Sequence, residues 1–261
     1  MKRLTEIWIY PIKSLGGIRL RSSRVLPKGL EHDRRWMLID EHGGFLTQRT
    51  LPSLALIKME HHANRLWVSY QNERWPLPWQ PSGTGRIRTH VWDDEVFVRE
   101  VDESRSGWFS DILQQPVRLV AFPEEEARPV DPRYAHAHEH VSLADGYPLL
   151  VIGESSLADL NSRLKSPVPM NRFRPNLVFS GGEPYEEDGW DFFAIGQNKF
   201  KGVKPCARCV MTTIDQATAQ MSKEPLATLA SYRKRDNKIY FGQNVIALNA
   251  HEIHEGDEIV C

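Results

Sequence analysis

The first hundred residues alternate short apolar and polar runs, a pattern typical of β-strands that are buried on one face. Gly, Asn and Asp turn residues separate these runs, and strands recurring about every eight to twelve residues favour an antiparallel barrel or sandwich. The expected strands are residues 4–10, 36–40, 45–47, 54–59, 65–70, 86–92 and 95–101.

Helical spacing of apolar residues appears later in the chain. Residues 106–113 and 154–164 carry their large apolar side chains on one helical face, and 225–234 reads as a short helix. Residues 123–140 are rich in charge, proline and histidine and lack periodicity, so they predict a loop and a domain boundary. Further strands are expected at residues 148–152, 177–180, 193–195, 200–203, 210–214, 239–247 and 258–260.

Composition limits the class of protein. The 261 residues can form one large domain or two closely packed ones, and the formal net charge of −1 gives no field that would attract nucleic acid or an anionic membrane. No apolar run is long enough to span a bilayer, and the N-terminal residues do not resemble a signal peptide. The expectation is a cytoplasmic protein with neither a nucleic-acid nor a membrane partner.

Two of the three cysteines form a Cys206-Ala-Arg-Cys209 motif. Lys204 and Arg208 flank the thiols, and nearby cations favour the thiolate, a soft ligand for metals. The expected strand at residues 210–214 argues against a thioredoxin-like pair, which should open a helix. Two other interpretations of the motif remain open. The cysteines could be structural, or they could form a zinc site with ligands from among His136, His138 and His140.

Several cations occur at turns beside apolar strands. Lys13 and Ser14 precede a Gly-Gly pair, and Arg174 and Asn176 flank a proline at the entry to a strand. Such positions suit the recognition of an anion, because a guanidinium is a fixed fork for phosphate or carboxylate. The segments 33–36 and 47–49 add further arginines at strand edges.

Ordered blocks along nearly the whole chain resemble the MOSC proteins that carry an N-terminal β-barrel domain. Within that family the chain is similar to the mitochondrial amidoxime-reducing component and its bacterial counterparts. The blocks are residues 10–14, 33–36, 156–164, 173–176, 206–215, 223–226 and 241–243.

The resemblance implies a mainly β (α+β) fold. An N-terminal β-barrel-like domain over residues 1–125 would pack on a C-terminal MOSC β-barrel with a few helices over residues 126–261. It also implies a molybdenum cofactor, molybdopterin with its metal, in the groove between the two domains. Cys209 would ligate the metal, whereas Cys206 matches a position that does not. The matching cofactor-binding positions are Lys13, Ser14, Arg34, Arg174, Asn176 and Arg208.

The implied activity is reduction of a small N-hydroxylated or N-oxide compound. Three cysteines do not provide a plant-type iron–sulfur motif, so a separate electron donor of ferredoxin or cytochrome type is expected. The alternative is a non-catalytic cofactor carrier or a sulfur-transfer module that works through a persulfide on Cys209.

Overall fold

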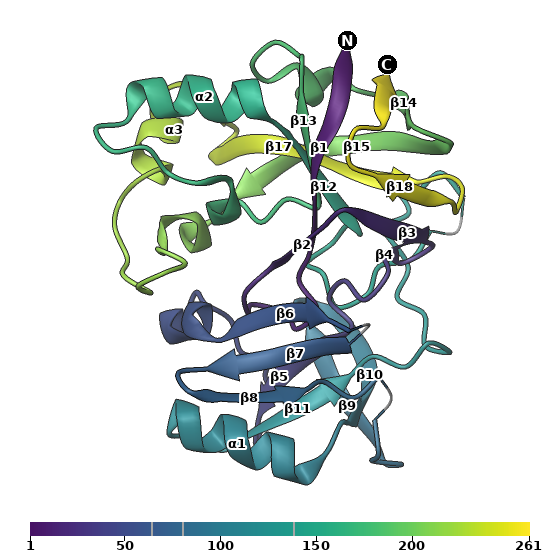
Figure 1. Cartoon of the computed structure of the whole chain (residues 1–261), viewed down its shortest axis with the longest axis vertical. Coiled ribbons are helices and arrows are strands. Elements are labelled where there is room, and N and C mark those ends of the chain that lie inside the picture. Colours follow the sequence, from purple (N-terminus) through teal and green to yellow (C-terminus); the bar gives the residue numbers. More distant parts are fainter. Residues whose placement is uncertain (64, 80, 138) are drawn as a thin grey trace.

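The computed structural model describes residues 1–63, 65–79, 81–137 and 139–261. The chain is mostly β, and its strands form two groups that lie one above the other in Figure 1. The first group contains β5 to β11 with helix α1, and the second contains β1 and β12 to β19 with helices α2 and α3. The predicted mainly β fold with a few helices is confirmed.

In the part of the chain that the structure describes, seven strands close into a barrel. Their order is β12-β13-β1-β19-β14-β15-β17, and β17 pairs back onto β12. β2 and β16 extend this sheet at its sides. These strands are β1 (Lys2–Ile9), β2 (Ile18–Leu20), β12 (Leu149–Gly153), β13 (Leu177–Ser180), β14 (Phe192–Ile195), β15 (Asn198–Arg208), β16 (Lys234–Arg235), β17 (Lys238–Ala247) and β19 (Glu258–Val260).

The other group is a half-barrel of two small sheets. One sheet has the order β5-β11-β10-β9 and the other the order β6-β7-β8. α1 packs against β11, and Phe109 of this helix is fully buried. The elements are β5 (Trp36–Asp40), β6 (Lys58–His62), β7 (Arg65–Tyr70), β8 (Glu73–Pro76), β9 (Arg86–Val91), β10 (Asp94–Glu100), α1 (Glu103–Leu113) and β11 (Val117–Ala121).

The N-terminal residues belong to the barrel although they come first in the sequence. β1 pairs with β13 and β19, and β3 (Ser22–Leu26) pairs with both β18 (Glu252–His254) and β4 (Gly29–Leu30). The two ends of the chain therefore lie close together (Figure 1). The predicted domain boundary near residue 125 stays a prediction, although β1, which precedes the boundary, pairs with β13 and β19, which follow it.

The apolar pattern of β1 explains its register. Leu4, Ile7 and Ile9 are buried, and the break in alternation between the first two coincides with a register shift against β13 at Leu4 and Glu6. A β-bulge inserts one residue and so returns the next apolar side chain to the buried face. The bulge keeps all three side chains in the core.

Three predicted strands are wrong. Residues 45–47 form only an isolated bridge, between Phe45 and Ile39, because the chain turns at Thr47, whose hydroxyl accepts from the backbone N–H of Arg49 at 3.1 Å. Residues 210–214 form the 3₁₀ helix η4 (Val210–Thr213), because the hydroxyls of Thr212 and Thr213 donate to the carbonyls of Cys209 and Val210 at 3.1 and 2.7 Å. Such side-chain bonds to the local backbone compete with strand pairing. Residues 54–59 divide into the 3₁₀ helix η1 (Pro52–Leu56) and the start of β6, since a proline at the first helical turn pre-sets its backbone.

The predicted helices are present with shifted ends. α1 begins three residues early because Asp102 caps it, its side chain accepting from the backbone N–H of Arg105 at 3.2 Å. Two further 3₁₀ turns are η2 (Met170–Arg172) and η3 (Glu186–Gly189), and the other helices are α2 (Glu154–Arg163) and α3 (Leu226–Tyr232). Within the described ranges, no helix is long and apolar enough to cross a membrane.

Candidate functional site

One cavity collects the predicted site residues from both groups of strands. With the solvent at its mouth it takes up about 900 Å³. All seven residues predicted for the site line it, namely Lys13, Ser14, Arg34, Arg174, Asn176, Arg208 and Cys209. Segments more than a hundred residues apart in the sequence therefore lie side by side in the wall of the cavity. The assignment of these residues to a cofactor stays a prediction.

The cavity wall contains strained backbone. Ser14, Arg34 and Arg174 have positive φ angles of 69°, 48° and 54°, in the left-handed region that residues with a Cβ seldom occupy. Each such residue costs about 1–3 kcal/mol and persists where its surroundings fix it. Strained residues concentrate at binding and catalytic sites, which supports a functional role for this wall.

Arg34 and Arg174 enclose the ring of Tyr10, with guanidinium carbons 4.4 and 4.1 Å from its centroid. Arg34 Nη1 also donates to Asp33 at 2.7 Å and to Asn176 Oδ1 at 3.0 Å, and Arg174 Nη1 donates to the Leu15 carbonyl at 2.7 Å. Burial lowers the pKa of Arg174 to about 10, and the charge of Arg34 acts in the same direction. Both groups stay cationic at neutral pH.

Asn176 acts within the protein in this structure. Its Oδ1 accepts from Arg34 and from the backbone N–H of Leu150 at 3.2 Å, and its Nδ2 donates to the Trp8 carbonyl at 3.1 Å. The side chain is buried, with 1% of its surface exposed. Asn176 therefore fixes the orientation of the Arg34 guanidinium.

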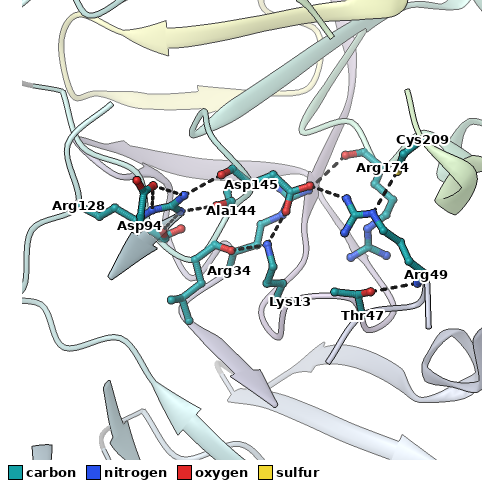
Figure 2. A network of polar contacts seen from close by, with 12 residues as sticks. Lys13, Arg34, Thr47, Arg49, Asp94, Arg128, Ala144, Asp145, Arg174 and Cys209 are labelled. Atoms are coloured by element: carbon teal, nitrogen blue, oxygen red, sulfur yellow. Dashed lines mark hydrogen bonds and ion pairs between the residues drawn. The ribbon is translucent and has the colours of Figure 1, made fainter. Parts of the chain in front are cut away.

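Asp145 lies between two cations (Figure 2). It accepts from Lys13 Nζ at 2.6 Å and from Arg49 Nη2 at 2.9 Å. Desolvation alone would raise the pKa of Asp145, but Lys13 and Arg49 together hold it below its usual range. Asp145 is thus a carboxylate at neutral pH, and it joins two cations of the N-terminal half.

The two cysteines of the motif have different partners. Cys209 Sγ accepts a hydrogen bond from Arg49 Nε at 3.3 Å, whereas Cys206 Sγ accepts from Arg208 Nη1 at 3.1 Å. Cys206 lies within β15, and Cys209 follows the end of that strand and is the N-cap residue of η4. Both sulfurs thus accept from a guanidinium, but only Cys209 is linked, through Arg49, to Asp145.

The sequence alone does not identify three polar residues of the lining as site residues. It indicates Arg49 only as one of several arginines at strand edges, and it does not single out Asp145 or Arg172. Arg172 Nη2 donates to Asp215 at 2.8 Å. In the sequence, Arg49 is 96 residues from Asp145 and 160 residues from Cys209, the two residues that it bonds. No local motif could therefore have identified these contacts.

A zinc site finds no support in the structure. In residues 1–63, 65–79, 81–137 and 139–261, no three His, Cys, Asp or Glu side chains are grouped so as to hold a metal ion. His138, one of the three candidate histidines, lies outside the described residues.

The donor set fits an anionic cofactor that carries a soft metal. The described lining contains six cationic side chains, Lys13, Arg34, Arg49, Arg172, Arg174 and Arg208, against the single carboxylate of Asp145. Crowded buried cations repel each other and lose hydration, so a phosphate placed among them would be stabilised. The thiol of Cys209 adds one soft ligand at the same wall.

Comparison with known proteins identifies the family of both parts of the chain. Residues 1–116 match the family described as the MOSC N-terminal beta barrel domain, and residues 138–260 match the MOSC domain. The human mitochondrial amidoxime-reducing component 1 is 36% identical over 98% of this chain and 82% of its own length.

The chain belongs to the MOSC family.

A second MOSC relative has a different name. The molybdenum cofactor sulfurase of Oryza sativa subsp. japonica is 35% identical over 97% of this chain but only 33% of its own length. Among solved structures, the YUAD protein from Bacillus subtilis matches 99% of this chain and 94% of its own, at 9% identity and a TM-score of 0.47. The similarity to the amidoxime-reducing component extends over most of both proteins, and that to the sulfurase over one part of a longer chain.

Proposed function

We propose that this MOSC protein binds a molybdenum cofactor in the cavity, with the Cys209 thiolate as protein ligand to the metal, and reduces small N-hydroxylated compounds. The observation that carries the proposal is the convergence of two cysteine thiols, Cys206 and Cys209, and six cations on a wall shared by both halves of the molecule. The choice of substrate is supported by the name of the human relative, whose similarity to this chain extends over most of both proteins.

The chain's own residues would bind and orient the cofactor. Lys13, Arg34 and Arg174 would pair with its phosphate and pterin oxygens, since buried guanidinium and ammonium groups form strong charge-assisted hydrogen bonds. Tyr10 holds two of these groups in place through its ring. When bound, the cofactor would supply a metal centre for two-electron chemistry.

The reaction requires protons and electrons from outside the substrate. Reduction of an N–OH group to N–H consumes two electrons and two protons and releases water. The cavity is open to solvent, which would supply protons, and a separate ferredoxin- or cytochrome-type protein would supply electrons.

A second candidate is cofactor or sulfur transfer through a persulfide on Cys209. The similarity to part of a molybdenum cofactor sulfurase favours it. In that case the purified protein would carry sulfane sulfur and no catalytic metal centre.

Metal and pterin analysis of protein from molybdenum-replete cells tests the proposal. Wild-type protein should contain molybdenum and pterin in near-equal amounts and should reduce a small amidoxime. Cys209→Ala should lose the metal and the activity, because the other thiol of the lining, Cys206, is bonded to Arg208 and would not replace the thiolate.

Cys206→Ala is the matched control, since its sulfur bonds to Arg208, whereas that of Cys209 bonds to Arg49. It should keep most of the metal and of the activity. Equal loss of molybdenum in both variants would indicate a two-thiolate site and refute the assignment, and sulfane sulfur without molybdenum in the wild type would favour the transfer module.

A further inference from the structure

The side chain of Arg49 reaches Cys209 from the opposite half of the molecule. It starts on the segment between β5 and η1, and its Nε donates to Cys209 Sγ at 3.3 Å (Figure 2). The sulfur that would bind the metal is thus already hydrogen-bonded by a residue to which no role has been assigned.

Two further contacts fix the Arg49 guanidinium. It stacks 4.6 Å from the ring centroid of Trp92, and its Nη2 donates to Asp145 Oδ2 at 2.9 Å. The side chain is 20% exposed, so most of its surface is in contact with protein. A guanidinium held by a ring, a carboxylate and a sulfur has little freedom to turn away.

The backbone of Asp145 is itself held by the buried side chain of Arg128. Arg128 Nη2 donates to the Asp145 carbonyl at 2.7 Å, Nη1 donates to the Ser142 carbonyl at 3.0 Å, and Nε donates to Asp94 in β10 at 2.7 Å. Lys13 holds the other carboxylate oxygen at 2.6 Å. The loop that carries Asp145 is therefore attached to the half-barrel, which also carries Arg49.

We infer that Arg49 is a positioning residue for Cys209, and that Asp145, held by Arg128, keeps Arg49 in place. This inference rests on the proposed function, in which Cys209 ligates the metal. A metal-bound thiolate keeps lone pairs that accept hydrogen bonds, and hydrogen bonds from neighbouring groups orient metal ligands and adjust their electron donation. Arg49 would direct the sulfur toward the cavity and withdraw charge from it.

Substitution of Arg49 by Gln and by Lys tests this role. Arg49→Gln removes the charge, and Arg49→Lys keeps the charge but cannot bond Sγ and Asp145 while it stacks on Trp92. Both variants should shift the thiolate-to-molybdenum absorption band and lower molybdenum affinity by about 10- to 100-fold, the usual effect of losing such a neighbour. Asp145→Asn should give a smaller shift in the same direction.

Arg88→Gln is the control, because Arg88 lies in the same half with a side chain that is 68% exposed. It should match the wild type in absorption, metal content and melting temperature. The melting temperature of each Arg49 variant, measured without cofactor, shows whether a loss of metal results from unfolding. If a variant does unfold, the absorption band of the molecules that retain metal still reports on the bonding of the sulfur.

The outcomes separate the two claims. An unchanged band and normal metal content in both Arg49 variants, with metal lost from Cys209→Ala, would overturn the role of Arg49 alone. Full molybdenum content in Cys209→Ala would overturn both claims.

Discussion

At the scale of single residues, the cavity combines backbone strain with fixed side chains. The carbonyl of Ser14 accepts from Gln48 Nε2 at 2.7 Å, Arg34 is tied to Asn176, and Arg174 is tied to Leu15. These bonds hold three residues in left-handed backbone that would otherwise relax. The cations therefore keep their places before any anion binds, which reduces the entropy lost on binding.

Arg174→Lys should weaken cofactor retention. Lysine keeps the charge but loses the planar fork that stacks on Tyr10 and bonds to the Leu15 carbonyl. One lost charge-assisted hydrogen bond is worth about 1.5–3 kcal/mol, so pterin content after gel filtration should fall by about tenfold or more. Pterin fluorescence per chain measures the loss.

Arg163→Lys serves as the matched control. Arg163 also stacks on a tyrosine, 4.3 Å from the Tyr232 ring centroid, and pairs with Asp159, but it lies on α2 and is not part of the cavity lining. It should bind pterin like the wild type. Normal pterin content in Arg174→Lys would remove Arg174 from the proposed site.

The residues of the cavity wall that belong to short sequence motifs could be predicted from the sequence. Lys13 with Ser14, Arg174 with Asn176 and the cysteine pair are each local, and each lines the cavity. Arg49 and Asp145 depend on contacts between distant segments, and nothing in their neighbours distinguishes them from ordinary turn residues. The bond between Arg208 and Cys206 was not predicted either, because it depends on side-chain directions along β15.

At the scale of elements, strand β15 places both cysteines of the motif in the cavity wall: Cys206 lies within the strand, and Cys209 directly follows its last residue. Its pairing with β17 shifts register between Gly202 and Lys204 and again between Pro205 and Ala207. Register shifts bend a strand and change the direction of its side chains. The sequence predicted strand at residues 200–203 but not its continuation to Arg208, because a proline within the run argues against an ordinary strand.

Gly202→Ala should destabilise the barrel. A Cβ at this position would lie 1.8 Å from the Trp190 carbonyl oxygen, and the Gly202 N–H donates to the Asp191 carbonyl at 2.6 Å, so the backbones would have to separate. We expect the free energy of unfolding to fall by at least about 1–3 kcal/mol, the usual cost of overpacking. Urea unfolding followed by tryptophan fluorescence measures the change.

Gly107→Ala is a control with the opposite expected sign. Gly107 lies in α1, and a Cβ there would meet nothing within 4 Å. Alanine should raise the free energy of unfolding by about 0.5–1 kcal/mol, because glycine is a poor helix former. Equal stability of Gly202→Ala and the wild type would mean that the bulge does not require glycine.

At the scale of the whole molecule, the cavity lies where the half-barrel meets the barrel. The half-barrel supplies Arg49, whereas Arg174 and Cys209 come from segments attached to the barrel. The mainly β fold was predictable from alternation and turn residues. The pairing of the first strand with the last one was not, since partners at the two ends of a chain leave no local pattern.

The last prediction concerns the supply of electrons. The chain has three cysteines, two of which line the cavity, so it lacks the four thiolates of a plant-type iron–sulfur cluster. It also has no Gly-x-Gly-x-x-Gly fingerprint for a dinucleotide, because its Gly-Gly pairs are isolated at turns. We therefore predict that a two-electron reduction in this cavity takes its electrons from a separate carrier protein or from an artificial donor.

Purified, cofactor-loaded protein should reduce a small amidoxime with a reduced viologen, and should not do so with NADH or NADPH alone. Adding a ferredoxin- or cytochrome-type carrier with its reductase should restore turnover from the nicotinamide donor. Amidine formation measured by chromatography distinguishes the cases, with Cys209→Ala as the blank for direct reduction by viologen. Steady turnover from NADH by the pure protein would contradict this prediction, because it would require a dinucleotide site that the sequence motifs do not indicate.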